Sequence, residues 1–163
     1  MRKIRGFTLI ELMVVIFMIA VLSAFAVPGI MSWRSAAKLR GAAENLKGHL
    51  EYTKMRAIQE NGPVAVLFYE DAYQIFVDTG GSPGALDAED VILKRISLAP
   101  GIKIDSSATT FLPSGNHWPK KTRFFGRSTA ASGTVVLKNE GRTKGKAISV
   151  SSLGKITLKS HDF

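Results

Sequence analysis

The pattern of apolar and polar positions predicts a membrane-spanning helix close to the N-terminus. Residues 7–27 form an apolar run of 21 residues that contains one charged residue, Glu11. A run of about 20 apolar residues is long enough to cross a bilayer as a helix. A carboxylate within such a run is costly unless it has a partner, so Glu11 is a candidate functional residue.

Apolar positions recur with helical spacing beyond this run. They follow one another at alternating steps of four and three residues, which places them on one face of a helix. These positions are Leu39, Ala43, Leu46, Leu50, Thr53 and Ala57. Asn61-Gly62-Pro63 is a strong helix terminator. We therefore expect one helix from about residue 7 to residue 60, roughly 80 Å long at 1.5 Å per residue.

After Pro63 the pattern changes to short segments rich in β-branched and aromatic residues, separated by glycines and other turn residues. The expected strands are 64–69, 73–77, 91–98, 102–104, 122–125, 134–137, 147–150 and 156–158. Short segments at this spacing indicate antiparallel sheets. The predicted fold class is α+β, with one long N-terminal helix packed on a C-terminal β-sheet head of about 100 residues.

Composition and motifs exclude or disfavour several kinds of functional site in this 163-residue chain. It has no cysteine, which excludes disulfides and cysteine-based metal sites. His49, His117 and His161 lack the spacing of a metal site. No glycine-rich phosphate loop and no nucleophile elbow occurs. We therefore predict a single domain without cofactor, metal or enzymatic activity.

The N-terminal leader is basic, with Arg2, Lys3 and Arg5. Positive charges keep that side of a membrane helix in the cytoplasm, so the head is expected on the other side. A secretory signal cut near Ala26, or a plain signal anchor, is the alternative. The apolar run is longer than the roughly 7 to 15 residues of a typical signal core, which disfavours a secretory signal.

Gly6-Phe7-Thr8-Leu9-Ile10-Glu11 resembles the processing site of type IV prepilins and type II secretion pseudopilins. The resemblance implies that a prepilin peptidase cuts between Gly6 and Phe7 and methylates the new Phe7 amine. It also implies that Glu11 sets the axial register of an incoming subunit. Glu11 as a snorkelling acid near the helix end is the alternative.

Pro28, followed by Gly29, interrupts the predicted helix near the membrane exit. A proline at this position also matches the pilin resemblance. Proline removes one helical hydrogen bond and clashes with the preceding turn. It is therefore either a plain kink or a hinge used in assembly when the subunit leaves the bilayer for a filament.

The head resembles GspH/FimT-type minor pseudopilins at several places. These are Tyr52–Ile58 followed by Val64–Phe68, then Phe124-Phe125-Gly126, Ser132–Leu137, Ile148–Ser151 and Gly154-Lys155-Ile156. The resemblance implies a pilin-like fold with two small sheets. It also implies a low-copy subunit at or near the tip of a type II secretion pseudopilus or type IV pilus, which primes assembly for protein secretion.

The resemblance implies an organisation in four parts. Residues 1–6 are a leader that is removed, 7–28 a transmembrane assembly helix, 29–61 the periplasmic half of the helix, and 62–163 the head. The protein is then a single-pass protein of the inner membrane with its head in the periplasm. The implied partners are other major and minor pilins, the inner-membrane assembly platform and the prepilin peptidase.

Charge is unevenly distributed along the chain, whose net charge is +9. Residues 60–114 carry three basic and eight acidic groups, and residues 115–163 carry ten basic and two acidic groups. The basic part is compatible with binding to DNA phosphates, and the resemblance to FimT-type minor pilins implies DNA binding in an uptake pilus as an alternative function. The candidate residues are Lys120, Lys121, Arg123, Arg127, Arg142, Lys144, Lys146, Lys155 and Lys159.

Two interpretations compete with DNA binding. The basic part is otherwise a solvated face, or a surface that matches the acidic residues 70–90 of a neighbouring subunit. The glycine-arginine-any-arginine motif of DNA-binding FimT-type pilins corresponds here to Gly154-Lys155-Ile156-Thr157, which departs from it at both arginines. Sequence alone leaves the three interpretations open.

The segment Gly80–Asp90 is a predicted loop with three acidic residues, Asp87, Glu89 and Asp90. It is a candidate for contact with secreted cargo or for binding calcium. The acids lack the ordered ligand spacing of an EF-hand loop, which disfavours calcium. A surface loop without a ligand is the remaining interpretation.

Overall fold

The computed structural model describes residues 7–113, 117–140 and 144–162. The chain divides into two units between Ala37 and Lys38. Its helix is α1 (Leu9–Glu60). Its strands are β1 (Val64–Phe68), β2 (Ala72–Val77), β3 (Val91–Ser97), β4 (Ile102–Ile104), β5 (Lys120–Phe124), β6 (Gly133–Asn139), β7 (Lys144–Val150) and β8 (Ile156–Asp162). The long helix and all eight strands expected from the sequence are confirmed.

The strands form two antiparallel sheets of four strands each. Sheet A has the order β3-β2-β1-β5 and sheet B the order β4-β6-β7-β8. The last three strands are longer than predicted, at seven residues each. Pairing continues through their polar ends, as between Lys144 and Asp162, because a neighbouring strand supplies backbone partners to polar and apolar residues alike.

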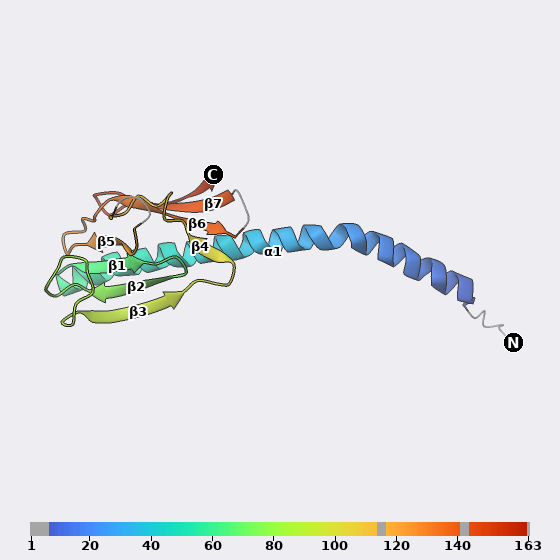
Figure 1. Ribbon diagram of the computed structural model, residues 1–163, viewed down its shortest axis with the longest axis horizontal. Helices are drawn as coiled ribbons and strands as arrows, with labels where there is room; N and C mark the ends of the chain where they lie inside the picture. Colours follow the sequence, from blue (N-terminus) through green and yellow to red (C-terminus); the bar gives the residue numbers. More distant parts are fainter. Residues whose placement is uncertain (1–6, 114–116, 141–143, 163) are drawn as a thin grey trace. The chain divides into compact units, whose positions relative to one another are not determined.

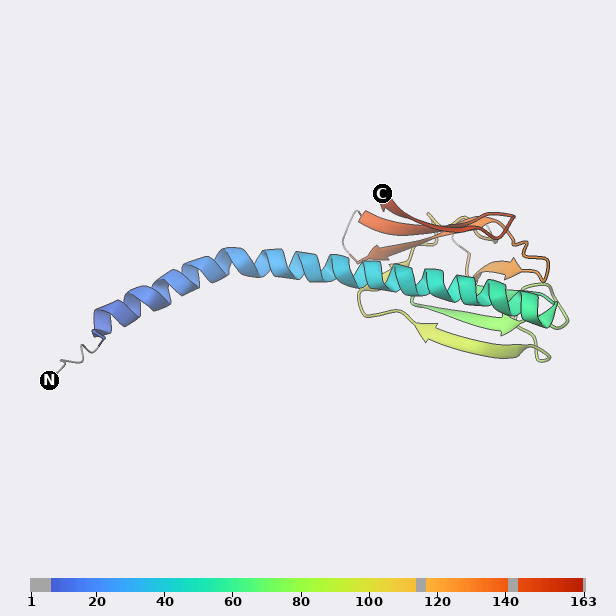
Figure 2. The same cartoon turned by 180° about the vertical axis from the view of Figure 1, so that it is seen from behind.

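The end of α1 beyond residue 37 packs against both sheets (Figures 1 and 2). The predicted apolar face is confirmed: Leu46, Leu50 and Ala57 are fully buried in one core with residues of both sheets. Each buried leucine contributes about 1.5–3 kcal/mol to folding. Thr53, the one polar residue on this face, is also buried and donates its hydroxyl hydrogen bond to the His49 carbonyl at 2.7 Å.

The predicted helix terminator acts through its backbone. Asn61 has a positive φ of 48°, the left-handed conformation that commonly follows a helix. Its N–H donates to the Ile58 carbonyl, and the Gly62 N–H donates to the Ala57 carbonyl, both at 3.2 Å. These two bonds form a Schellman motif, which satisfies the carbonyls at the helix end.

α1 is helical on both sides of Pro28. The proline has no N–H, so the carbonyl of Ala24 lacks its usual helical donor. The interruption expected at this position therefore costs one hydrogen bond without ending the helix.

Tyr73 of β2 ties the helix to sheet A. Its side chain is buried, and its hydroxyl lies 2.7 Å from Nδ1 of His49 on α1. Burial raises the pKa of Tyr73 to about 12, so the hydroxyl stays protonated at neutral pH. The bond satisfies a polar group that the core would otherwise leave without a partner.

Candidate functional site

The first part of α1 presents apolar side chains that its own unit does not cover. Every residue from 7 to 25 is exposed, including Phe7 at 84% and Phe17 at 69%. Contiguous apolar surface of this kind marks a membrane or protein contact. Within the described part of the chain, α1 alone has the length and composition to cross a membrane.

Thr8 and Glu11 cap the start of this helix. The Thr8 N–H donates to Glu11 Oε2 at 3.0 Å, and the Glu11 N–H donates to Thr8 Oγ1 at 3.3 Å. The Thr8 hydroxyl also donates to Oε2, at 3.0 Å. This reciprocal arrangement is a capping box. Its Thr-x-x-Glu spacing is visible in the sequence, whereas the expectations for Glu11 rested on its charge and on the pilin resemblance.

The capping box uses only one of the two carboxylate oxygens of Glu11. Thr8 uses Oε2, and no group in residues 7–113, 117–140 or 144–162 bonds Oε1. An exposed carboxylate oxygen at the start of the apolar surface can accept a cation from another chain. Phe7 is described, whereas Gly6 on the other side of the expected cleavage point lies outside the described residues.

Lys120 does not belong to a basic surface, which corrects one expectation from the sequence. Its side chain is fully buried on the core side of β5, and its Nζ donates to the Pro113 carbonyl at 2.8 Å. Burial lowers the pKa of Lys120. A buried amine cannot reach the phosphates of a nucleic acid, so Lys120 has a structural role.

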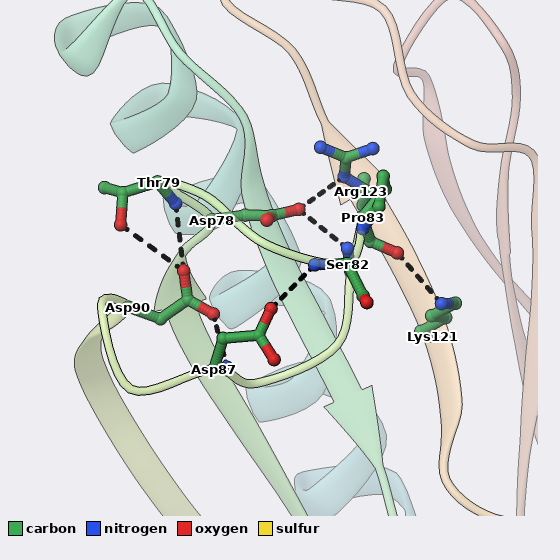
Figure 3. A network of polar contacts seen from close by, with 9 residues as sticks. Asp78, Thr79, Ser82, Pro83, Asp87, Asp90, Lys121 and Arg123 are labelled. Atoms are coloured by element: carbon green, nitrogen blue, oxygen red, sulfur yellow. Dashed lines mark hydrogen bonds and ion pairs between the residues drawn. The ribbon is translucent and has the colours of Figure 1, made fainter.

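Lys121 and Arg123, the next two candidates on β5, hold the loop between β2 and β3 (Figure 3). Lys121 Nζ donates to the Pro83 carbonyl at 2.9 Å. Arg123 Nε lies 2.6 Å from Oδ2 of Asp78, whose side chain is only 2% exposed. Both side chains therefore bond the protein's own loop, and Lys121 does so with one of the three donors of its ammonium group.

The aspartates of this loop bond its own backbone (Figure 3). Asp90 accepts the N–H groups of Thr79 and Asp87 at 2.9 and 2.8 Å. Asp87 accepts the Ser82 N–H at 2.7 Å. The described residues contain no group of three or more metal-type side chains. The aspartates thus shape the loop, and nothing in this geometry favours the calcium interpretation.

Gly84 lets the loop approach β5 closely. Its φ is +70°, and a Cβ atom at this position would lie 3.1 Å from Cδ of both Lys121 and Arg123. Glycine alone combines this backbone conformation with this approach. Asp78 accepts the Gly84 N–H at 2.8 Å, which fixes the contact.

The remaining basic candidates are on or near sheet B. Arg127 and Lys155 are on two turns that touch, because a Cβ on Gly154 would lie 2.5 Å from the Ser128 carbonyl oxygen. Lys146 donates to Ser160 Oγ at 3.0 Å. Lys159 is exposed on β8, Lys144 begins β7, and Arg142 lies outside the described residues. The candidates among the described residues therefore do not form one surface.

Comparison with known proteins identifies two matching families. Residues 42–154 match the model of Type II transport protein GspH, and residues 1–27 match the Prokaryotic N-terminal methylation motif. The Type II secretion system protein H of Pseudomonas aeruginosa is 39% identical over 75 residues. That alignment spans 46% of this chain and 44% of the relative, less than half of its length.

Three solved structures have a similar fold. The type IV minor pilin FimU of Pseudomonas aeruginosa has a TM-score of 0.57 and 17% identity, covering 78% of this chain and 92% of FimU. The minor pseudopilin EpsH of the Vibrio cholerae Type 2 Secretion System has a TM-score of 0.54 and 12% identity, covering 76% and 97%. GspH of E. coli has a TM-score of 0.56 and 18% identity, covering 76% and 88%. At these identities the likeness concerns the fold.

Proposed function

We propose that this chain, which belongs to the GspH family of type II transport proteins, is a minor pseudopilin or minor pilin that primes a filament and stays near its tip. One observation carries the proposal: a single helix has an exposed apolar segment in its first part and contributes with its last part to the core of the head. A soluble domain has no use for the first part of such a helix. A subunit that waits in a membrane and then packs against sister helices needs it.

The proposed assembly step uses two residues of the processing motif, Phe7 and Glu11. Removal of residues 1–6 creates a cationic amine at Phe7, and Glu11 Oε1 is the exposed acceptor four residues later. Pairing between the amine of one subunit and the carboxylate of another is charge-assisted and directional. Repetition of one such head-to-tail contact gives an open helical filament.

The proposed location and partners follow from this step. Residues 7–28 anchor the protein in the inner membrane, and residues 29–61 carry the head of residues 62–163 into the periplasm. Prepilin peptidase removes the leader, and the assembly platform delivers the subunit to other pilins. Asp78, Asp87 and Asp90 bond within the head, so they contribute little to the matching of acidic and basic surfaces between subunits.

Localisation of the protein on filaments tests the tip position. We expect that deleting the gene reduces the number of filaments per cell, and that immunogold against the head labels one end of each filament. Restoring the gene must restore the filament number. Label along the whole filament would contradict the tip position, and an unchanged filament number in the deletion strain would contradict priming.

We propose DNA binding as a second function, supported by the contact between the turns of Arg127 and Lys155. Full-length protein in lipid nanodiscs should bind a labelled DNA duplex with a dissociation constant of about 10⁻⁴ to 10⁻⁶ M at moderate salt. Replacing both residues by alanine removes two phosphate contacts, so the slope of binding against salt should fall by about two. Lys47→Ala on α1 is the matched control. Absence of binding at low salt would contradict this function.

A further inference from the structure

A groove of about 710 Å³ lies on the face of sheet A that is turned away from the main core. Leu67 and Lys121, which are paired between β1 and β5, line it together with Tyr69. The loop between β2 and β3 contributes one wall, and further lining comes from Leu112, Pro113, Trp118 and Pro119. Its volume falls in the usual range for ligand sites, about 300–1,000 Å³.

Hydrogen bonds to Lys121 hold two parts of this lining in place. On the loop side, Lys121 Nζ donates to the Pro83 carbonyl at 2.9 Å, and the aspartates of the loop brace it from within (Figure 3). On the other side, the Lys121 backbone N–H donates to the Leu112 carbonyl at 2.6 Å. A groove that is formed before its ligand arrives loses less conformational entropy on binding.

The polar side chains of the groove are mainly hydrogen-bond donors. Lys121 is the one charged residue among the lining residues, and its ammonium group has three donors and no acceptor, with one donor bonded to the Pro83 carbonyl. The Trp118 indole is a donor only, and Tyr69 carries a hydroxyl. Neither Tyr69 nor Trp118 has a side-chain hydrogen-bond partner among the described residues. A ligand that fits this groove therefore has hydrogen-bond acceptors, a negative charge and apolar groups that contact the apolar lining residues.

A proline-rich peptide in the polyproline II conformation meets these requirements. Proline residues have carbonyls but no backbone N–H, so such a peptide presents mostly acceptors. Aromatic side chains, as in other grooves for these peptides, contact its proline rings. A β-strand would instead bring as many N–H donors as acceptors. The Lys121 charge then selects a peptide with an acidic residue.

We propose that this groove binds a proline-rich, acidic segment of a partner protein, a function beyond filament assembly. A second copy of this chain is not the occupant, because its six prolines are scattered, at 28, 63, 83, 100, 113 and 119. None is within four residues of another, so the chain has no proline-rich segment. The partner is therefore a different protein that meets the head on this face.

Peptide binding to the full-length protein in lipid nanodiscs tests the proposal, with fluorescence anisotropy as the readout. The probe is a fluorescein-labelled decapeptide with proline at every third position, leucines between, and two glutamates. One control peptide has lysines in place of the glutamates, and a second has alanines in place of the prolines. We expect both controls to bind about tenfold more weakly than the probe. Equal binding of the three peptides, or no binding of the probe, would overturn the proposal.

Variants of the groove provide a second test. Lys121→Glu should reverse the preference, so that the lysine peptide binds better than the probe. Tyr69→Phe keeps the aromatic ring, and loss of the hydroxyl should weaken binding of the probe peptide severalfold. Lys159→Glu makes the same charge change on exposed β8 and should leave binding unchanged. Loss of binding in Lys159→Glu equal to that in Lys121→Glu, or unchanged binding in Tyr69→Phe, would overturn the proposal.

Discussion

Replacing Glu11 by alanine should leave membrane insertion and leader cleavage intact and reduce filament assembly to the level of a strain that lacks the gene. The reason is that, in the proposed assembly step, this carboxylate pairs with the amine of a neighbouring Phe7. Without it, that amine is left unpaired among apolar helices, which is strongly unfavourable. Filament counts and secreted protein measure assembly, and the size of the mature protein on a gel measures cleavage.

Two further variants separate the charge of Glu11 from its role in capping the helix. Glu11→Gln keeps an acceptor for Thr8, since glutamine also forms capping boxes, but it removes the charge. Thr8→Ala removes the cap and keeps the charge. We expect Glu11→Gln to fail in assembly as Glu11→Ala does, and Thr8→Ala to retain most assembly. Normal filaments in Glu11→Gln would show that the carboxylate charge does not set the register.

Replacing Asp78 by alanine should reduce the free energy of unfolding by about 3 kcal/mol, because it removes one partner of a largely buried ion pair. Arg123 would lose the carboxylate that lies 2.6 Å from its Nε. The buried Gly84 N–H would also lose its acceptor. Urea unfolding of the full-length protein in nanodiscs, followed by tryptophan fluorescence, measures the change.

Matched variants show whether the ion pair causes this loss. Lys47→Ala breaks the exposed Lys47–Glu51 pair and should change stability by no more than about 0.5 kcal/mol. The double variant Asp78→Ala with Arg123→Met should be more stable than Asp78→Ala alone, because no unpaired charge remains. A loss for Asp78→Ala as small as that for Lys47→Ala would show that the pair does not support the loop.

The most accurate predictions from the sequence concerned features that depend on residues close together in the chain, such as the buried face of a helix and the helix end. The alternating spacing from Leu39 to Ala57 identified the buried face of α1 because a helix repeats every 3.6 residues. Asn61 and Gly62 marked the helix end because their own backbone preferences allow the motif found there. Strand ends were less accurate, because pairing with a neighbouring strand extended β7 and β8 beyond their apolar residues.

The one error concerned a charged residue. Lys120 looked like its neighbours in a basic stretch, but alternation along β5 turns it toward the core, where Pro113 provides an acceptor. For the acidic loop, the sequence already favoured a surface loop without a ligand over a calcium site, and its aspartates reach the backbone N–H groups of the same loop. Whether a charged side chain faces solvent or bonds within the protein depends on which groups the fold brings near it.

The sequence by itself determined that this protein has a long helix with an apolar first part and an acid near its start, followed by a β-sheet head. These features depend on local periodicity and on a short motif, which any fold of the chain must respect. Only the tertiary structure decided which cations face solvent and that a donor-rich groove lies on sheet A. The groove brings together residues such as Leu67, Gly84 and Trp118. Residues so far apart in the chain meet only when two strands and two loops pack together.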